Sequence, residues 1–178
     1  MILVVSDRPW VAAAFAEWRP MTSSGRPMNT AFVTTLAAIV EKFGRYDPAD
    51  AIIVPHWSNR IPADVYEATQ CIGFHLGDLP HGRGGTPLQN LHVRGIYKTT
   101  LCAFQITEEM DAGPVYLRQP VDISEGSAET IYRNLARLSL AMAEKIIKER
   151  IEPQPQVGRA TVWKRRTPEE SRIPLGLS

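Results

Sequence analysis

The sequence predicts an α/β protein of three layers, in which a mainly parallel, twisted sheet is flanked by helices. Short runs of apolar, β-branched residues at 1–6, 51–54 and 71–75 are typical of strands buried on both faces. Segments with helical spacing of apolar residues alternate with these runs, as in strand–helix–strand units. Ligands bind beyond the carboxyl ends of such strands, so we expect a site in the loops that follow Val54 and His75.

The first half of the chain supplies three helix patterns. Asp7 and Pro9 offer a cap and a helix-starting proline before a helix over residues 10–18. The proline- and glycine-containing segment 19–28 predicts a loop. Apolar residues at helical spacing then predict a helix over residues 31–43, and a short helix is expected near residues 62–68.

The second half predicts two more strands and a long helix. Strands are expected at 99–106 and 114–121, with the acidic turn 107–113 between them. The strongest helix pattern covers residues 127–150 and has one apolar stripe, which we expect to pack on the sheet. The residues after 150 are punctuated by prolines and carry the basic–acidic segment 163–172 (WKRRTPEESR).

Composition limits the classes of protein. The length predicts one domain over residues 1–178, with a core over 1–150 and a tail over 151–178. Twenty Lys and Arg against 19 Asp and Glu give a net charge of +1, which favours neither nucleic acid nor a membrane surface as partner. No apolar run is long enough to span a bilayer, so a cytoplasmic protein is expected. Cys71 and Cys102 lie in strand patterns and are expected to be buried free thiols.

The segment 73–87 (GFHLGDLPHGRGGTP) has the densest set of polar and glycine residues. Its glycines allow close approach of the backbone to an anion, although a tight surface turn would have the same composition. His75 ends the strand, where it could be an acid/base group, a metal ligand or a hydrogen-bonded core histidine. No HExxH or Cys/His spacing accompanies it, so no metal site is predicted. Phosphate-loop and dinucleotide patterns are also absent, because no glycine follows the first strand.

Asp111 stands out in the acidic turn. Three carboxylates in four residues are usually a solvated turn, and Glu108 and Glu109 fit that interpretation. Asp111 is followed by Ala112, Gly113 and a proline, which favour one defined loop shape. It is therefore the carboxylate that we expect to turn inward.

These segments resemble the folate-dependent formyltransferases. That family has an Asn-x-His pattern followed by Leu-Pro, Arg-Gly and a proline, and this chain has His75, Leu79-Pro80, Arg83-Gly84 and Pro87. Residues 110–114 resemble the family's Asp-x-Gly segment, and residues 51–65 resemble the strand and loop that border its folate pocket. One position departs from the pattern, because Gly73 stands where the family has its asparagine. Asn59 and Asn90 are candidates for a compensating amide.

The resemblance implies a formyltransferase fold, related to the Rossmann fold, with a shortened N-terminal half. It implies transfer of a formyl group from 10-formyltetrahydrofolate, without a metal, to a primary amine, and it is compatible with a homodimer. His75 and Asp111 would be catalytic. The expected cofactor-binding residues are Asn59, Arg60, Ile61, Thr107, Glu108, Glu109 and Met110; the expected substrate-binding residues are Asp78, Arg83, Gly84 and Asn90.

The acceptor is a separate question. Formyltransferases of initiator tRNA carry a further C-terminal domain and a basic surface, whereas this chain ends at residue 178 with a net charge of +1. The tail segment 163–171 (WKRRTPEES) resembles one in sugar N-formyltransferases, although a solvated charged end is an equal alternative. We therefore expect a small acceptor, an amino-sugar nucleotide of surface-sugar (pseudaminic-acid-type) synthesis. Another amine, such as glycinamide ribonucleotide, or a non-catalytic folate- or nucleotide-binding protein are the alternatives.

Overall fold

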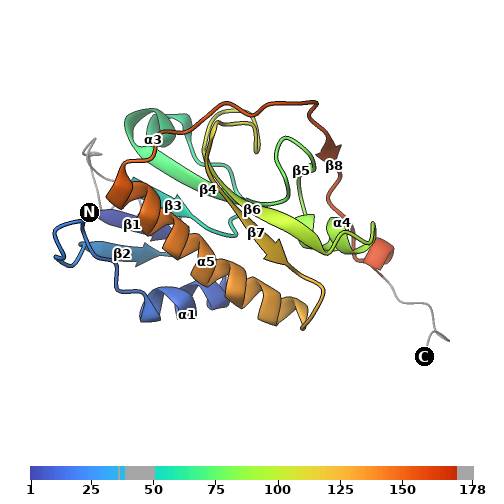
Figure 1. Cartoon of the computed structure of the whole chain (residues 1–178), viewed down its shortest axis with the longest axis horizontal. Helices are drawn as coiled ribbons and strands as arrows, with labels where there is room; N and C mark the ends of the chain where they lie inside the picture. The colour runs from blue at the N-terminus through green and yellow to red at the C-terminus, as the bar shows by residue number, and fades with distance from the viewer. Residues whose placement is uncertain (36, 39–50, 172–178) are drawn as a thin grey trace.

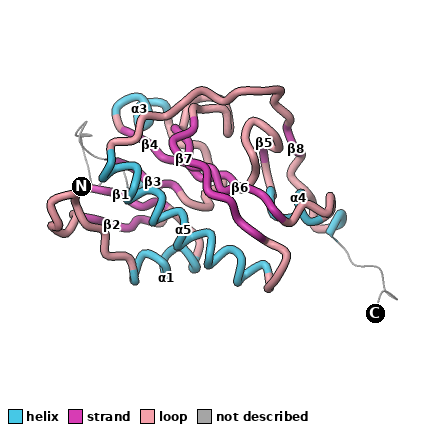
Figure 2. Tube along the Cα trace, viewed as in Figure 1, coloured by secondary structure: helices cyan, strands magenta, loops and turns pink. Residues whose placement is uncertain are grey.

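The computed structural model describes residues 1–35, 37–38 and 51–171 of the chain. Its centre is a six-stranded sheet in the order β2-β1-β3-β4-β6-β7 (Figures 1 and 2). The strands of this sheet are β1 (Ile2–Val5), β2 (Thr30–Val33), β3 (Ala51–Val54), β4 (Gln70–Leu76), β6 (Lys98–Gln105) and β7 (Val115–Asp122). The first four in spatial order are parallel to one another, and β6 and β7 are antiparallel additions beside β4. The predicted mainly parallel α/β sheet is thus confirmed.

Helices cover both faces of the parallel part. On one face lie α1 (Pro9–Glu17) and α5 (Ala128–Glu149); in Figure 1, α5 runs across the sheet and α1 lies beside it. Apolar side chains of both helices pack with Val4 and Ile53 of the strands. On the other face, the short α3 (Ala63–Ala68) places Val65 against a second apolar cluster of β1, β3 and β4. The three predicted layers follow from these two clusters.

Helix α5 follows the pattern of its sequence closely. Its N-cap is Ser127, whose hydroxyl oxygen accepts a hydrogen bond from the Thr130 N–H. Ile131, Leu135 and Ile146 of the predicted stripe are buried. These buried contacts hold the helix against the sheet. Its first turns lie at the carboxyl edge of the strands.

The helix predicted over residues 31–43 is wrong at its start. Residues Thr30–Val33 form β2, which pairs in parallel with β1, and Val33 is buried. Phenylalanine, valine and threonine favour strands, and the open edge of β1 supplies hydrogen-bond partners that outweigh the local helical spacing. Residues 36 and 39–43 of the predicted helix lie outside the described residues.

Four short elements were not predicted. They are α4 (Pro87–His92), β5 (Arg83–Gly84), β8 (Val162–Trp163) and the 3₁₀ turn η1 (Glu169–Ser171). After α5 the tail runs back across the molecule, and Figure 1 shows it passing beside β5. There β8 pairs in parallel with β5, and Gln154 forms a bridge with Val115 at the start of β7. The tail thereby contacts both loops that sequence analysis singled out.

Both cysteines are buried core thiols, as predicted. Burial raises the pKa of Cys71 to about 12 and also raises that of Cys102. None of the helices in the described part of the chain is both long and apolar enough to cross a membrane.

Candidate active site

A cavity of about 690 Å³ opens at the carboxyl ends of β1, β3 and β4. The loop after β1, the loop after β3 and the end of β4 form its floor, as expected for a parallel sheet. The acidic turn before β7, the first turns of α5 and Arg165 of the tail complete its walls. Segments far apart in sequence therefore meet at one edge of the sheet.

His75 and Asp111 meet in this cavity. The Nδ1 atom of His75 lies 3.3 Å from Oδ2 of Asp111, and His75 is only 4% exposed. The Gly84 N–H donates a hydrogen bond to the same carboxylate oxygen at 2.8 Å. On its other side, Nε2 of His75 lies 2.8 Å from the carbonyl oxygen of Gly82. Both ring nitrogens thus face acceptor oxygens: Nε2 is within hydrogen-bond distance of the Gly82 carbonyl, and Nδ1 is in close contact with the Asp111 carboxylate.

Asp111 is held in an uncommon backbone conformation. Its φ is +55°, in the left-handed region that residues with a side chain rarely adopt. Two residues later, a Cβ at Gly113 would lie 1.8 Å from the carbonyl oxygen of Gln105, so this turn packs directly on the backbone of β6. The defined loop shape that the small residues predicted is therefore present, and it turns the Asp111 carboxylate toward His75.

The absence of a side chain at position 73 is explained by the neighbouring ring of Phe104. A Cβ at this position would lie 2.7 Å from Cζ of Phe104 and 3.1 Å from Cγ1 of Ile106. Phe104 is buried in a cluster with Leu79 and Val115. The phenylalanine ring thus fills the space that a side chain at position 73 would need, and an asparagine there requires the ring to move.

All seven residues predicted to bind a cofactor line the cavity. They are Asn59, Arg60, Ile61, Thr107, Glu108, Glu109 and Met110. Together with Phe104 and Ile106 they combine apolar walls with a few polar groups, the usual make-up of a small-molecule site.

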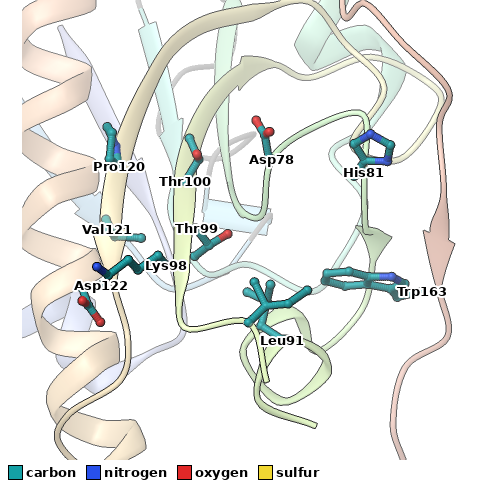
Figure 3. Close-up of a pocket in the computed structure, with 11 residues that line it drawn as sticks. Asp78, His81, Leu91, Lys98, Thr99, Thr100, Pro120, Val121, Asp122 and Trp163 are labelled. Atoms are coloured by element: carbon teal, nitrogen blue, oxygen red, sulfur yellow. The ribbon is translucent and has the colours of Figure 1, made fainter. Parts of the chain in front are cut away.

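Three of the four predicted substrate-binding residues do not line it. Asp78 lines a second cavity of about 600 Å³ with His81 and Trp163 (Figure 3), and it pairs with Arg118 at 3.0 Å. It points there because the chain turns away from the sheet directly after β4. Gly84 is the one residue of this set that lines the active-site cavity.

Arg83 and Asn90 form hydrogen bonds between neighbouring segments of the chain. The Arg83 guanidinium is bonded to Gln156 and Glu109. The Asn90 amide donates to the carbonyl oxygens of Gly85 and Lys164, and its own oxygen accepts from Arg94. Of the two candidate compensating amides, only Asn59 therefore reaches the cavity.

An aromatic cluster forms a part of the cavity to which the sequence analysis assigned no role. The Trp10 ring stacks on Tyr132 with centroids 5.2 Å apart, and the His56 ring meets the edge of Tyr132 at 5.4 Å. Trp10 Nε1–H donates to His56 Nδ1 at 2.8 Å, so the hydrogen of a neutral His56 lies on Nε2. Burial, and then the charge of Arg8, lower the pKa of His56 to about 4. The sequence signal was the aromatic and histidine residues directly after the first and third strands.

The described residues contain no group of three or more His, Cys, Asp or Glu side chains that could hold a metal ion. The fold and the site together define an α/β protein in which a buried histidine contacts a half-buried carboxylate at the carboxyl edge of the sheet. Such a pair is suited to moving protons and stabilising developing charge.

Comparison with known proteins assigns the family. No protein-family model matches the chain. A curated methionyl-tRNA formyltransferase of Thermodesulfovibrio yellowstonii is 31% identical over 129 residues, which are 68% of this chain and 42% of the relative. The solved methionyl-tRNA formyltransferase of Clostridium thermocellum superposes with a TM-score of 0.82 at 31% identity, covering 99% of this chain and 77% of the other. The chain belongs to the folate-dependent formyltransferase family.

More distant structures share the fold. HypX from Aquifex aeolicus in complex with tetrahydrofolic acid has a TM-score of 0.77 at 21% identity, covering 99% of this chain and 32% of HypX. A 4-N formyltransferase from Francisella tularensis has a TM-score of 0.66 at 14% identity, covering 96% and 84%. The chain spans less than half the length of the curated relatives it matches.

Proposed function

We propose that this chain transfers a formyl group from 10-formyltetrahydrofolate to the primary amine of a small acceptor. The observation that carries the proposal is the His75–Asp111 pair, which lies in a cavity of about 690 Å³ beside all seven residues predicted for the folate. Membership of the formyltransferase family supports it.

The cavity residues fit the folate. Ile61, Phe104 and Ile106 offer apolar surface for a flat ring, while Asn59, Thr107 and the 108–111 turn offer polar groups for its edges. Bound there, 10-formyltetrahydrofolate would supply an activated formyl group close to the His75–Asp111 pair.

His75 would stabilise the charge that develops in the reaction, and Asp111 would orient the His75 ring. Attack of an amine places negative charge on the formyl oxygen, and a positioned N–H donor stabilises that charge. The Nε2–H group of His75 would turn from the Gly82 carbonyl to this oxygen, while Asp111 holds the opposite side of the ring. The pair would take up the proton released by the amine and return one to the leaving nitrogen, so that it is unchanged after turnover.

We propose an amino-sugar nucleotide as the acceptor. The cluster of Trp10, His56 and Tyr132 lines the same cavity as the catalytic pair and offers aromatic surface of the kind that packs against sugar rings and bases. Arg8 and Arg165 also line the cavity and can face phosphates. The net charge of +1 disfavours a polyanion such as tRNA.

Methionyl-tRNA is the second candidate acceptor. The observation in its favour is the 31% identity to methionyl-tRNA formyltransferases in both sequence and structure comparisons.

The test is an acceptor panel. The purified chain is incubated with 10-formyltetrahydrofolate and, separately, with 4-amino-sugar nucleotides, glycinamide ribonucleotide and methionyl-tRNA, and products are identified by mass spectrometry. A formylated amino-sugar nucleotide supports the proposal. Product from glycinamide ribonucleotide or methionyl-tRNA, without product from any amino-sugar nucleotide, refutes the sugar assignment. Folate binding without product from any acceptor supports the non-catalytic alternative.

A further inference from the structure

One side chain of the tail connects the two catalytic loops. Gln156 Nε2 donates hydrogen bonds to the carbonyl oxygens of Asp111 and Gly113, both at 2.8 Å. Its Oε1 accepts from Nη2 of Arg83 at 2.9 Å and from Nε at 3.3 Å. The Gln156 amide thus donates to the turn that carries Asp111 and accepts from Arg83 in β5.

That turn needs external support. Asp111 has a φ of +55°, in the left-handed region that costs more than the right-handed one even for an aspartate, so contacts that hold the turn favour this conformation. On one side, Gly113 packs on the backbone of β6. On the other side, the Gln156 amide bridges the carbonyl groups at both ends of the 111–113 segment.

The same contacts align β5 with the carboxylate. Arg83, which Gln156 binds, precedes Gly84, whose N–H donates to Oδ2 of Asp111 at 2.8 Å. Arg83 also reaches Glu109 at 3.0 Å, in the same acidic turn as Asp111. Gln156 thus binds the Asp111 backbone directly, and it binds Arg83, the residue before the Gly84 N–H that holds the carboxylate.

The tail stays docked without this side chain. The backbone of Gln154 exchanges two hydrogen bonds with Val115, at 2.7 and 2.8 Å. The backbone of Thr161 accepts from Arg83 and donates to Pro80. Between residues 154 and 162, Gln156 is the one residue that is not exposed. Its inward amide is therefore an addition to a tail that the backbone already anchors.

We propose that Gln156 is a positioning residue, which holds the Asp111 turn so that the carboxylate stays against His75. This inference rests on the proposed formyl transfer for its kinetic consequence, but its structural consequence at His75 does not. Gln156 touches neither reacting group, so its removal should lower kcat and leave the KM values for folate and acceptor nearly unchanged.

The test compares Gln156→Leu, Gln156→Glu and the matched control Gln154→Leu. Gln154 is the same residue type two positions away, with an exposed side chain. A glutamate at 156 can still accept from Arg83 but cannot donate to the two carbonyl oxygens. We expect both Gln156 variants to lose about ten- to a hundredfold in kcat, the scale of a small misplacement of a catalytic group. Gln154→Leu should match the wild type.

A second readout does not need turnover. In ¹⁵N-histidine-labelled protein, the Nδ1–H signal of His75, assigned by its loss in His75→Gln, reports the contact with Asp111. It should shift or broaden in both Gln156 variants and stay unchanged in Gln154→Leu. If the wild-type protein formylates no acceptor, the proposed function has failed, and this signal alone decides the positioning role.

Either of two results overturns the inference. One is a Gln156→Leu protein with the kcat and imidazole signal of Gln154→Leu. The other is a Gln156→Glu protein with wild-type kcat and signal, because the contact with Arg83 would then suffice. The glutamate variant retains that contact and so also serves if Gln156→Leu fails to fold.

Discussion

Gly73→Ala tests whether Phe104 is the reason that position 73 has no side chain. The new Cβ would lie 2.7 Å from Cζ of Phe104, so the ring must retreat by about 0.7 Å to reach the 3.4 Å at which ordinary contacts begin. Phe104 is only 6% exposed and packs against Leu79 and Val115, although it also lines the cavity. Because most of the ring is held in this cluster, the packing around Phe104 must absorb most of the strain.

The magnitude follows from two opposing effects. Overfilling a packed core by one methyl costs about 1–3 kcal/mol. Gly73 has no positive φ, so alanine is compatible with its backbone and contributes about 0.4–1 kcal/mol through the lower entropy of the unfolded chain. We expect Gly73→Ala to lower the free energy of unfolding by about 1–2 kcal/mol. In a Phe104→Leu background the contact with the ring is removed and only the 3.1 Å approach to Cγ1 of Ile106 remains, so the same change should be close to neutral.

The assay is a double-mutant cycle. Urea unfolding of the wild type, both single variants and the double variant, followed by tryptophan fluorescence, gives four free energies. The expected coupling is about 1–2 kcal/mol, within the range found for residues in contact. An equal cost of Gly73→Ala in both backgrounds would refute the steric explanation, and so would a wild-type background that is stabilised by the alanine.

Three further predictions concern single groups. His75→Ala and Asp111→Ala should each reduce kcat about 10²–10⁴-fold while folate binding, measured by calorimetry, persists; near-wild-type rates would contradict the assigned roles. The pKa of His56 is lowered from the ordinary 6.5, which applies to the unfolded chain, to about 4 in the folded protein. Between these pH values the unfolded chain binds more protons at this residue, so the stability that is present above pH 6.5 is lost as the pH falls toward 4. His56→Asn, which tolerates the φ of +53°, should therefore lose less stability than the wild type between pH 7 and 5 in urea titrations, and parallel losses would contradict the shift. Cys71 and Cys102, at 1% and 0% exposed, should react with a thiol reagent at pH 8 only after unfolding, and fast reaction of the native protein would show that they are accessible.

Most of the secondary structure was predictable because it depends on local patterns. The apolar run 51–54 coincides with β3, and the apolar stripe of residues 127–150 coincides with α5 within a residue at either end. The helix predicted over 31–43 begins instead as strand β2, because this segment pairs in register with β1, which lies 28 residues earlier in the chain. Pairing between distant segments cannot be read from spacing within one of them.

By itself, the sequence determined the layered sheet and the resemblance to formyltransferases, and it predicted a site at His75 and Asp111. Only the tertiary structure decided what these groups touch: the Gly82 carbonyl on the far side of the His75 ring, the Gln156 amide behind Asp111 and the phenylalanine ring beside Gly73. It also turned Asp78 away from the site and brought Trp10, His56 and Tyr132 into it. The physical reason is that periodicity specifies which face of an element is apolar, whereas the direction of a side chain at a strand end depends on the neighbours that packing brings to it.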